Sequence, residues 1–376
     1  MDVYQALPLL GGISPQTFMR RFWQKKPLLV RQAVPGIMPV PDRAGLFELA
    51  AQKQVESRLV ARPGAPSQGG WRLRHGPFGR RALPPLKRPG WTLLVQGVDL
   101  HVEAARALLD QFRFVPDARL DDVMVSYASD GGGVGPHFDS YDVFLLQVLG
   151  QRRWRIGRQK ELALVPGMPL KILSTFEAEQ EFVLDPGDML YLPPRYAHDG
   201  VAIGECMTYS VGFKAPGRGD LAAEMLQRLA QDAPELAGDA LYRDAGQQAV
   251  QAPAAVPEAL AGFARTALQR VLLDPVALQR ALGESLTEPK ASVWFVPVAG
   301  AAPKGALRLD RKTRMMYDPQ HVFINGESFL AGGRDAVLMR ALADRRELPA
   351  RDVARLSAAA GALVRDWCEA GWLHGV

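Results

Sequence analysis

The sequence predicts an α+β protein in which an antiparallel β-sandwich or small β-barrel precedes a helical segment and a second, smaller mixed domain. Between Leu120 and Phe213, short apolar runs alternate with glycine, proline and aspartate turns, which is typical of sandwiches and barrels. Beyond Phe213 the strand pattern gives way to helical periodicity. In the last part of the chain, short strands alternate with short helices, and this combination favours a winged-helix-like domain.

The composition is that of a globular protein with several domains. Of the 376 residues, 48% are hydrophobic and 23% charged, which excludes a mostly disordered chain. A chain of this length usually forms two or three domains. No apolar run approaches the roughly 20 residues of a membrane span, and the N-terminus lacks the basic and apolar regions of a signal peptide. With 2 cysteines, neither a disulfide framework nor a thiolate metal site is expected, and we predict a cytoplasmic protein.

The charge balance argues against some partners. The chain has 45 Lys and Arg residues against 40 Asp and Glu residues, a formal net charge of +5. Because a dedicated nucleic-acid-binding protein usually concentrates more positive charge on one face, we do not expect direct nucleic-acid binding. A membrane partner is not expected either.

Helix-start and turn signals predict the first elements of the chain. Ser14 can cap a helix whose first position is Pro15, and Pro27 ends that helix before a short strand at 28–30. The following predicted elements are a helix at 43–52 and strands at 55–61 and 71–75 around a turn-rich stretch at 63–70. The stretch 91–98 fits either a strand or a helix, and a helix is predicted at 103–112.

The central region contains most of the predicted strands. They lie at 123–127, 143–149, 154–156, 182–184, 189–192 and 207–213. The dipeptide Gly150-Gln151 separates two of them and is interpreted as a two-residue hairpin turn. A second turn is predicted at 185–188.

The C-terminal part is predicted to be mainly helical. A helix is expected at 220–231, followed by an Ala-, Pro- and Gly-rich stretch at 232–257. The stretch 257–282 fits either one helix or two helices divided at Asp274-Pro275. The last predicted elements are strands at 292–297 and 307–309, helices at 335–343, 350–356 and 358–370, and a short strand at 372–373.

Three residues form the combination that carries chemistry. In an extended segment, His137 and Asp139 point the same way, so both can reach one metal ion. His198 is the candidate third ligand, because it follows a Gly-Asp turn, a predicted strand and two prolines in the same β-rich region. Two histidines and one carboxylate with open positions form the facial triad of non-haem Fe(II) oxygenases. A lone His-x-Asp pattern would more simply be a surface feature, and the distant histidine is what favours a metal site.

Arg152 is predicted to hold an anionic cosubstrate. If Gly150-Gln151 is a hairpin turn, Leu149 pairs with Arg152, and parity places both on the face of the metal ligands. A guanidinium is always charged and can bind a carboxylate bidentately, so it suits the far end of a dicarboxylate. Spacing alone leaves open that Arg152 belongs to a solvated basic turn.

Several short motifs occur in an order that resembles the JmjC-type ribosomal oxygenases. They are Ser57 to Val60, His75 to Phe78, Trp91 to Gln96, Gly131 to His137, Tyr141 to Phe144, Arg152 to Arg155 and Pro186 to His198. Each motif is weak by itself, but the ordered set is specific. The similarity also extends to the helical and C-terminal parts and therefore covers nearly the whole chain.

The resemblance implies a double-stranded β-helix of the cupin/JmjC type that binds Fe(II) and the cosubstrate 2-oxoglutarate. In the family, iron ligands occupy the positions of His137, Asp139 and His198. A basic residue at the position of Arg152 holds the distal carboxylate of the cosubstrate, and arginine there favours the bacterial branch. We expect Ser126, on a strand that lines the site, to be a further cosubstrate contact. The implied reaction is hydroxylation of an arginine β-carbon in a large-subunit ribosomal protein.

The resemblance also implies a division of the chain. We expect a catalytic domain at 1–215, a helical dimerisation segment at 216–285 and a winged-helix-like domain at 286–376. A homodimer would follow from the middle segment.

Three residues near the predicted metal site are candidate substrate contacts. Asp130 could pair with a substrate guanidinium, although it could equally be an ordinary turn residue. Tyr127 and Tyr141 lie on or next to strands that could line the site, and barrel packing is the simpler explanation for Tyr127. The stretch around Asp130 departs from the family pattern, so the substrate is less well defined than the cofactor.

Two other functions remain open from the sequence. The first is a dimeric cupin-type regulator that senses a ligand with its β-domain and binds DNA with its C-terminal domain. The second keeps the iron chemistry but acts on a small molecule or a methyl-lysine. A complete triad with Arg152 argues against a pure sensor, which needs no open metal positions.

Overall fold

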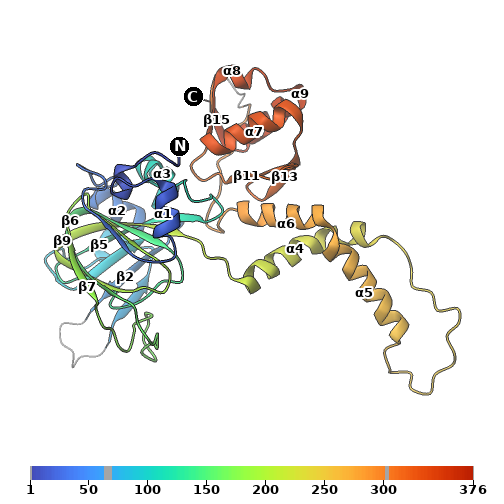
Figure 1. Ribbon diagram of the computed structural model, residues 1–376, viewed down its shortest axis with the longest axis horizontal. Helices are drawn as coiled ribbons and strands as arrows, with labels where there is room; N and C mark the ends of the chain where they lie inside the picture. The colour runs from blue at the N-terminus through green and yellow to red at the C-terminus, as the bar shows by residue number, and fades with distance from the viewer. Residues whose placement is uncertain (1, 63–69, 301–304, 376) are drawn as a thin grey trace. The chain divides into compact units, whose positions relative to one another are not determined.

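The computed structural model describes residues 2–62, 70–300 and 305–375, and the chain forms two compact units, Met1–Ala215 and Pro216–Val376 (Figure 1). Most of the turn-rich stretch predicted at 63–70 lies outside the described residues. The boundary predicted at residue 215 coincides with the division between the units, whereas the boundary at 285 stays a prediction. No described helix combines the length and the apolar character needed to cross a bilayer.

The first unit is built on an antiparallel sheet. Its strands are β1 (Leu28–Val30), β2 (Ser57–Ala61), β3 (Arg72–His75), β4 (Trp91–Val95), β5 (Leu120–Ala128), β6 (Val143–Gly157), β7 (Gln180–Leu184), β8 (Met189–Leu192) and β9 (Ala197–Phe213). Their order in the sheet is β1-β8-β6-β9-β5-β4-β2-β3, and β7 also pairs with β6. The long strands β6 and β9 run side by side along most of their length, so they form the centre of the unit.

Short helices cover one face of this sheet (Figure 1). They are η1 (Pro8–Leu10), α1 (Pro15–Arg21), α2 (Arg43–Ala50), η3 (Arg80–Ala82), η4 (Val98–Leu100) and α3 (Glu103–Asp110). As predicted, the Ser14 hydroxyl accepts a hydrogen bond from the Thr17 N–H and caps α1. The main core lies between these helices and the sheet, and the opposite faces of β6 and β8 pack into a second core inside the barrel.

Strand β6 corrects one prediction, because Gly150-Gln151 is not a hairpin turn. The strand continues from Val143 to Gly157, and its register with β9 shifts on either side of Leu149. Gly150 has φ +59°, so the irregularity is a β-bulge built on a left-handed glycine.

The bulge reverses the side-chain parity along β6. Before it, Leu145 faces the barrel interior and Phe144 faces the helical layer. After it, the even-numbered Trp154 faces the interior. The bulge therefore turns Arg152 inward and leaves Arg153 exposed, which an unbroken alternation would have reversed.

Gly150→Ala is expected to destabilise the protein by about 3 kcal/mol or more. A Cβ at Gly150 would stand 2.0 Å from the Glu205 carbonyl oxygen, in addition to the cost of a left-handed alanine. Gly204→Ala is the matched control, because Gly204 has φ +70° but nothing within 4 Å of its added Cβ. We expect the control to cost only about 1 kcal/mol. Thermal unfolding compares the two variants, and equal shifts would contradict this account of the bulge.

The second unit combines a helical layer with two small sheets. Its helices are α4 (Arg218–Ala237), α5 (Glu258–Leu273), α6 (Pro275–Thr287), α7 (Gly333–Arg345), α8 (Ala350–Val353) and α9 (Ala358–Glu369). Its strands are β10 (Leu307–Leu309), β11 (Met315–Tyr317), β12 (His321–Ile324), β13 (Glu327–Leu330), β14 (Glu347–Leu348) and β15 (Leu373–Gly375). They form the sheets β14-β10-β15 and β11-β12-β13.

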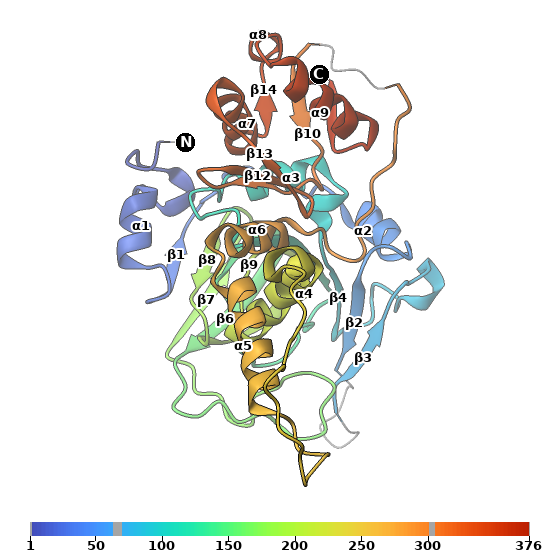
Figure 2. The ribbon, with the colours of Figure 1, turned by 90° about the vertical axis from the view of Figure 1, so that its right-hand side faces the viewer.

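The helical segment packs directly on the remainder of the second unit. Helices α4 and α6 lie side by side in both views (Figures 1 and 2), and an ion pair between Asp232 and Arg280 joins them. A Cβ at Gly283 of α6 would meet the Phe323 ring of β12 at 2.4 Å, so helix and sheet are in close contact. Of the two alternatives for 257–282, the division at Asp274-Pro275 is confirmed, since the Asp274 side chain caps α6.

One strand prediction for this unit is wrong, and one sheet was missed. The stretch predicted as a strand at 292–297 forms none in the described chain. The sheet β11-β12-β13 was not predicted. Its second turn is Asn325-Gly326, with φ values of +48° and +89°, and Asn-Gly is a strong signal for a two-residue hairpin.

Candidate metal centre and anion site

Backbone pairing brings the two predicted histidine ligands together. The His137 N–H donates to the His198 carbonyl at 3.0 Å, and the His198 N–H donates to the His137 carbonyl at 2.8 Å. The two residues therefore stand directly opposite each other, with their ring centroids 4.2 Å apart. They lie 61 positions apart in the sequence, and the fold brings them together.

Hydrogen bonds fix the orientation of both imidazole rings. His137 Nδ1 lies 2.9 Å from the Gly135 carbonyl oxygen, and His198 Nδ1 lies 3.0 Å from the Tyr196 carbonyl oxygen. A carbonyl only accepts, so each Nδ1 carries the proton and each Nε2 keeps a free lone pair. Burial, and then the nearby His137 ring, lower the pKa of His198 to about 4, which keeps this ring neutral at pH 7.

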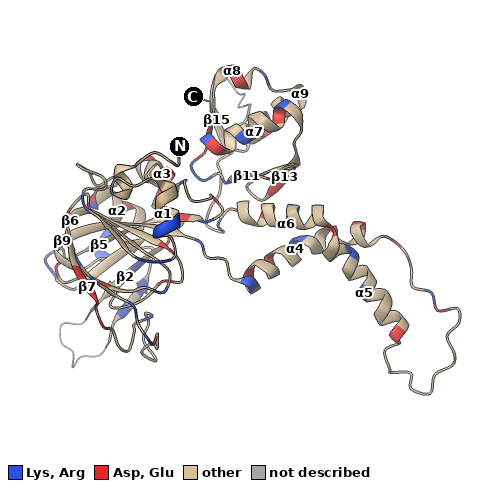
Figure 3. Cartoon of the chain, in the orientation of Figure 1, with Lys and Arg blue, Asp and Glu red and all other residues tan. Residues whose placement is uncertain are grey.

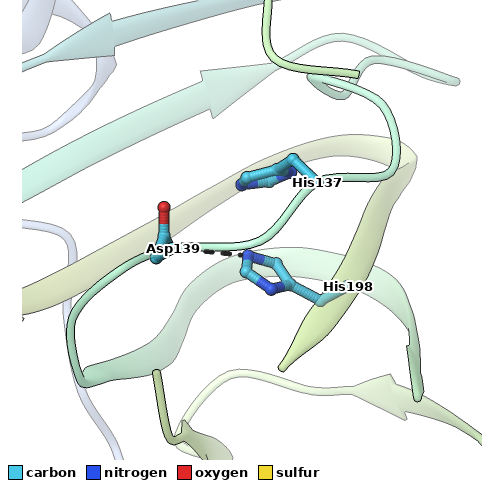
Figure 4. A group of neighbouring side chains, drawn as sticks. All are labelled: His137, Asp139 and His198. Atoms are coloured by element: carbon cyan, nitrogen blue, oxygen red, sulfur yellow. Dashed lines mark ion pairs between the residues drawn. The ribbon is translucent and has the colours of Figure 1, made fainter. Parts of the chain in front are cut away.

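Asp139 completes the group from the same extended segment (Figure 4). Its backbone carbonyl accepts the Arg195 N–H at 2.7 Å, which anchors it to the turn before β9. Its Oδ2 lies 3.7 Å from His198 Nε2, and the ligand atoms of all three residues lie within 4.8 Å of one another. Two imidazole Nε2 atoms and one carboxylate oxygen suit a divalent iron ion with open positions, so the residues fit the predicted metal.

Arg152 is buried in the barrel without an acidic partner among the described residues. Its side chain is 5% exposed, and Nη1 donates to the Ser126 hydroxyl at 3.3 Å. Its Nε and Nη2 are buried and have no hydrogen-bond partner. A buried cation with two unsatisfied donors is costly unless an anion occupies the space beside it. The site therefore fits a carboxylate ligand, and Ser126 lies next to Arg152 as predicted.

Trp154 is a further site residue that was not predicted from the sequence. Its ring centroid lies 5.8 Å from that of His198, and the Arg152 guanidinium carbon lies 5.7 Å from the centre of the same ring. Trp154 thus separates the metal centre from the buried cation on one side. A Cβ at Gly200 would lie 2.5 Å from this indole, so only glycine fits opposite it. The signal was available, because Trp154 and Arg152 are two residues apart in one strand.

Among the candidate substrate contacts, Tyr141 lies where the prediction placed it. Its side chain is 40% exposed, and its hydroxyl is close enough to the Asp139 carboxylate to interact with it electrostatically. Partial burial, followed by the charge of Asp139, raises the pKa of Tyr141 above its usual value, so the phenol stays protonated. Tyr141 is therefore an exposed hydrogen-bonding group beside the metal ligands.

Tyr127 is a core residue and not a substrate contact. It is fully buried, with its ring 5.1 Å from Phe47 and 5.2 Å from Trp91. Because neighbouring residues in a strand point to opposite faces, the inward position of Ser126 turns Tyr127 toward the helical layer.

Asp130, the remaining candidate substrate contact, is held by a hydrogen bond to β9. One of its carboxylate oxygens accepts the Gly204 N–H at 2.8 Å. Gly204 lies six residues beyond His198 on β9, which corresponds to about 20 Å of strand. The pairing of Asp130 with a substrate guanidinium therefore stays a prediction.

The barrel, the His-x-Asp pair with a distant histidine and the buried arginine together define the class of protein: a cupin-type oxygenase with a facial-triad metal centre. The protein-family model of the JmjC domain matches residues 107–221, and the family model of the ROXA-like winged helix matches residues 269–374. The ribosomal protein uL16 3-hydroxylase of Escherichia coli strain K12 is 34% identical over 281 residues, covering 74% of this chain and 73% of that protein. The chain belongs to the JmjC-type ribosomal oxygenase family.

Other comparisons agree with this assignment. A probable ribosomal oxygenase of Haemophilus influenzae is 36% identical over 228 residues, which cover 60% of this chain and 55% of that protein. The solved structure of YcfD, a ribosomal oxygenase from Escherichia coli in complex with cobalt and 2-oxoglutarate, matches with a TM-score of 0.79 and 29% identity. The match covers 95% of this chain and 97% of that one. The predicted fold class, a JmjC barrel with a C-terminal winged-helix-like domain, is thereby confirmed.

Proposed function

We propose that the protein is an Fe(II)- and 2-oxoglutarate-dependent dioxygenase that hydroxylates the β-carbon of an arginine in a large-subunit ribosomal protein. The observation that carries this proposal is the pairing of two sites in one barrel. One is a facial triad with fixed imidazole tautomers, and the other is a buried arginine with two unsatisfied donors. A metal ion would occupy the triad, and a dicarboxylate would pair with the buried arginine.

Each residue has a defined task in this proposal. His137, Asp139 and His198 hold Fe(II), and the carbonyls behind the two rings keep each Nε2 aimed at the metal. Arg152, positioned by Ser126, binds the carboxylate of 2-oxoglutarate farthest from the metal. When bound, the iron and 2-oxoglutarate supply the oxidising power that converts a substrate C–H bond and O₂ to C–OH, with succinate and CO₂ as coproducts.

The remaining residues shape the space around the reacting centre. The Trp154 indole packs between His198 and Arg152, where it excludes water from the space between the metal and Arg152. Tyr141 presents a protonated, partly exposed phenol beside Asp139, where it can donate a hydrogen bond to a bound peptide. The choice of substrate rests on the relative named ribosomal protein uL16 3-hydroxylase and on the bacterial type of arginine at position 152.

The test is incubation of the full chain with Fe(II), 2-oxoglutarate and purified large-subunit ribosomal proteins. We expect succinate release and a gain of one oxygen atom in one protein, which fragment-ion mass spectrometry then assigns to an arginine β-carbon. Loss of a methylene mass from a methylated lysine would instead identify a demethylase. Unchanged protein masses together with succinate release would indicate a different substrate.

We further propose that the protein is a homodimer formed through the helical segment. Helix α5 exposes a short apolar row of Leu268 and Leu272, which lie four residues apart on one face and have exposed fractions of 62% and 41%. Burying such a row against a second copy is favourable at about 25 cal/mol per Å². We also place the protein in the cytoplasm, where ribosomal proteins are made, and cell fractionation tests this.

The double variant Leu268→Glu/Leu272→Glu is expected to be monomeric, because it would bury two carboxylates in the proposed interface. Light scattering coupled to size-exclusion chromatography should give a mass near 41.1 kDa for the variant and about twice that for the wild type. Leu330→Glu, at a residue that is 82% exposed on β13, is the control and should leave the dimer intact. A monomeric wild type, or a dimeric double variant, contradicts the proposal.

A further inference from the structure

The modest net charge of the chain conceals one strongly basic segment. Between Ser57 and Val98 the sequence contains 8 Lys and Arg residues and no Asp or Glu. The remainder of the chain has 37 basic against 40 acidic residues, a net charge of −3. All of the excess positive charge therefore resides in this one segment of the first unit.

The fold places these cations along one edge of the sheet. Strand β3 is the last strand of the sheet, and Arg72 and Arg74 share one of its faces (Figure 3 shows the blue residues around β2). Arg74 Nη1 donates to the Ala82 carbonyl at 3.1 Å, which ties the strand to η3 and its arginines 80 and 81. The edge strand and the short helix thus form one continuous basic surface.

The loop that follows η3 adds two further cations and leads back to the sheet. Lys87 and Arg88 come just after η3, and the Arg62 N–H donates to the Gly90 carbonyl at 2.9 Å. The basic strip therefore consists of Arg62, Arg72, Arg74, Arg80, Arg81, Lys87 and Arg88.

All seven residues of the basic strip are exposed, and none forms an ion pair within the described part of the chain. Elsewhere in the same unit, arginines commonly have acidic partners, such as Arg106 with Asp110 and Arg113 with Asp117. Unpaired like charges repel one another and raise the free energy of the folded state, and an external polyanion relieves that repulsion.

One end of the basic strip lies near the segment that carries two of the metal ligands. The Arg62 guanidinium carbon lies 5.7 Å from the centre of the Trp71 ring. A Cβ at Gly135 would meet Trp71 Cζ2 at 2.8 Å, and Gly135 lies two residues before His137. A partner bound at the Arg62 end of the strip therefore lies near the segment that carries His137.

We propose that the basic strip binds the phosphate backbone of RNA, so that the enzyme engages its ribosomal protein substrate together with the RNA that this protein contacts. The choice of RNA rests on the proposed function, because ribosomal proteins are basic and would be repelled by the strip unless RNA accompanied them. Seven cations spread over a strand, a short helix and a loop match a chain of phosphates better than a single anion.

Protection of the sheet edge does not account for the basic strip. Lysines and arginines on an edge strand do prevent pairing with other strands, and Arg72 and Arg74 have that effect. Arg80, Arg81 and Lys87 lie outside the strand, however, and their charges add nothing to edge protection.

The test measures binding of the full chain to a fluorescein-labelled single-stranded RNA of roughly 20 nucleotides over a series of salt concentrations. The test variant is Arg72→Ala/Arg81→Ala/Lys87→Ala/Arg88→Ala, whose side chains have no hydrogen bond, ion pair or ring contact in the described chain. The control variant is Arg334→Ala/Arg345→Ala/Arg351→Ala/Arg365→Ala, with the same charge change on exposed positions of the second unit. Vesicles containing phosphatidylglycerol form a separate arm.

We expect the test variant to bind RNA about tenfold or more weakly and to reduce the slope of log K against log salt by about 3, at roughly 0.7 per phosphate contact. The control should bind like the wild type, and all three proteins should hydroxylate an RNA-free substrate peptide equally. Equal weakening in the control, binding to vesicles without binding to RNA, or no RNA binding by the wild type would overturn the proposal. Because the binding assay requires no turnover, its result is independent of whether the proposed reaction occurs.

Discussion

Replacing His137 by alanine is expected to lower succinate-forming turnover by roughly 10³-fold or more. The change removes one of three ligands, and the metal contributes several kcal/mol of transition-state stabilisation, of which about 4 kcal/mol corresponds to that factor. The variant should also bind Fe(II) more weakly, because the Asp139 carboxylate and the His198 ring alone cannot hold the metal in a facial arrangement.

His75→Ala is the matched control for this experiment. His75 is exposed on β3 and its side chain has no hydrogen bond or ion pair in the described structure, so the variant should retain wild-type turnover. The measurements are succinate release and the visible absorption of 2-oxoglutarate chelated to Fe(II) under anaerobic conditions. Thermal unfolding verifies that the His137→Ala protein is folded. Full turnover by a folded His137→Ala protein would eliminate the triad as the metal centre.

The metal ligands could be predicted because local rules place them. Residues that are two positions apart in an extended segment share a face. This rule alone brings His137 and Asp139 to one side. The approach of His198 depends on the pairing of the segment after Gly135 with the start of β9, and the sequence indicates only that both segments are extended. The resemblance to a family supplied that long-range contact.

Arg152 was predicted on an incorrect structural basis. A glycine followed by a polar residue between apolar runs fits a hairpin turn and a β-bulge equally well. Which one forms depends on β9, where the Glu205 carbonyl lies against Gly150. That contact spans more than 50 positions in the sequence, so it follows from the fold and not from the local pattern.

The failure of Tyr127 as a substrate contact could have been foreseen. Ser126 and Tyr127 are adjacent on a strand, so they cannot both face the barrel interior. The position of Asp130 could not be predicted, because it depends on how the glycine-rich segment runs along β9. The Ala202 N–H donates to the Gly132 carbonyl, so this segment runs alongside the strand.

The second large effect is expected at Arg152. In Arg152→Met, which keeps most of the side-chain volume but removes the charge, the KM for 2-oxoglutarate should rise about 30-fold or more. This corresponds to roughly 2 kcal/mol for a buried charge-assisted interaction. Arg152→Lys should lie between the wild type and Arg152→Met, because an ammonium restores the charge but not the bidentate geometry.

Arg153→Ala is the control, since Arg153 is the exposed neighbour on the opposite face of β6 and should leave the KM for 2-oxoglutarate unchanged. Steady-state kinetics at saturating substrate peptide provide these values. An Arg152→Met enzyme with a wild-type KM for 2-oxoglutarate would show that the cosubstrate is held elsewhere.

Stability measurements separate a ligand-binding role of Arg152 from a structural one. Without 2-oxoglutarate, the wild type buries a guanidinium with two unsatisfied donors, so Arg152→Met should unfold at the same temperature or a higher one. With 2-oxoglutarate and a catalytically inactive divalent metal, the wild type should gain thermal stability and the variant should gain much less. A residue that merely supports the barrel would give the opposite pattern, with the variant less stable in the absence of any ligand. The sign of the change in the ligand-free protein therefore determines whether this buried charge serves binding or folding.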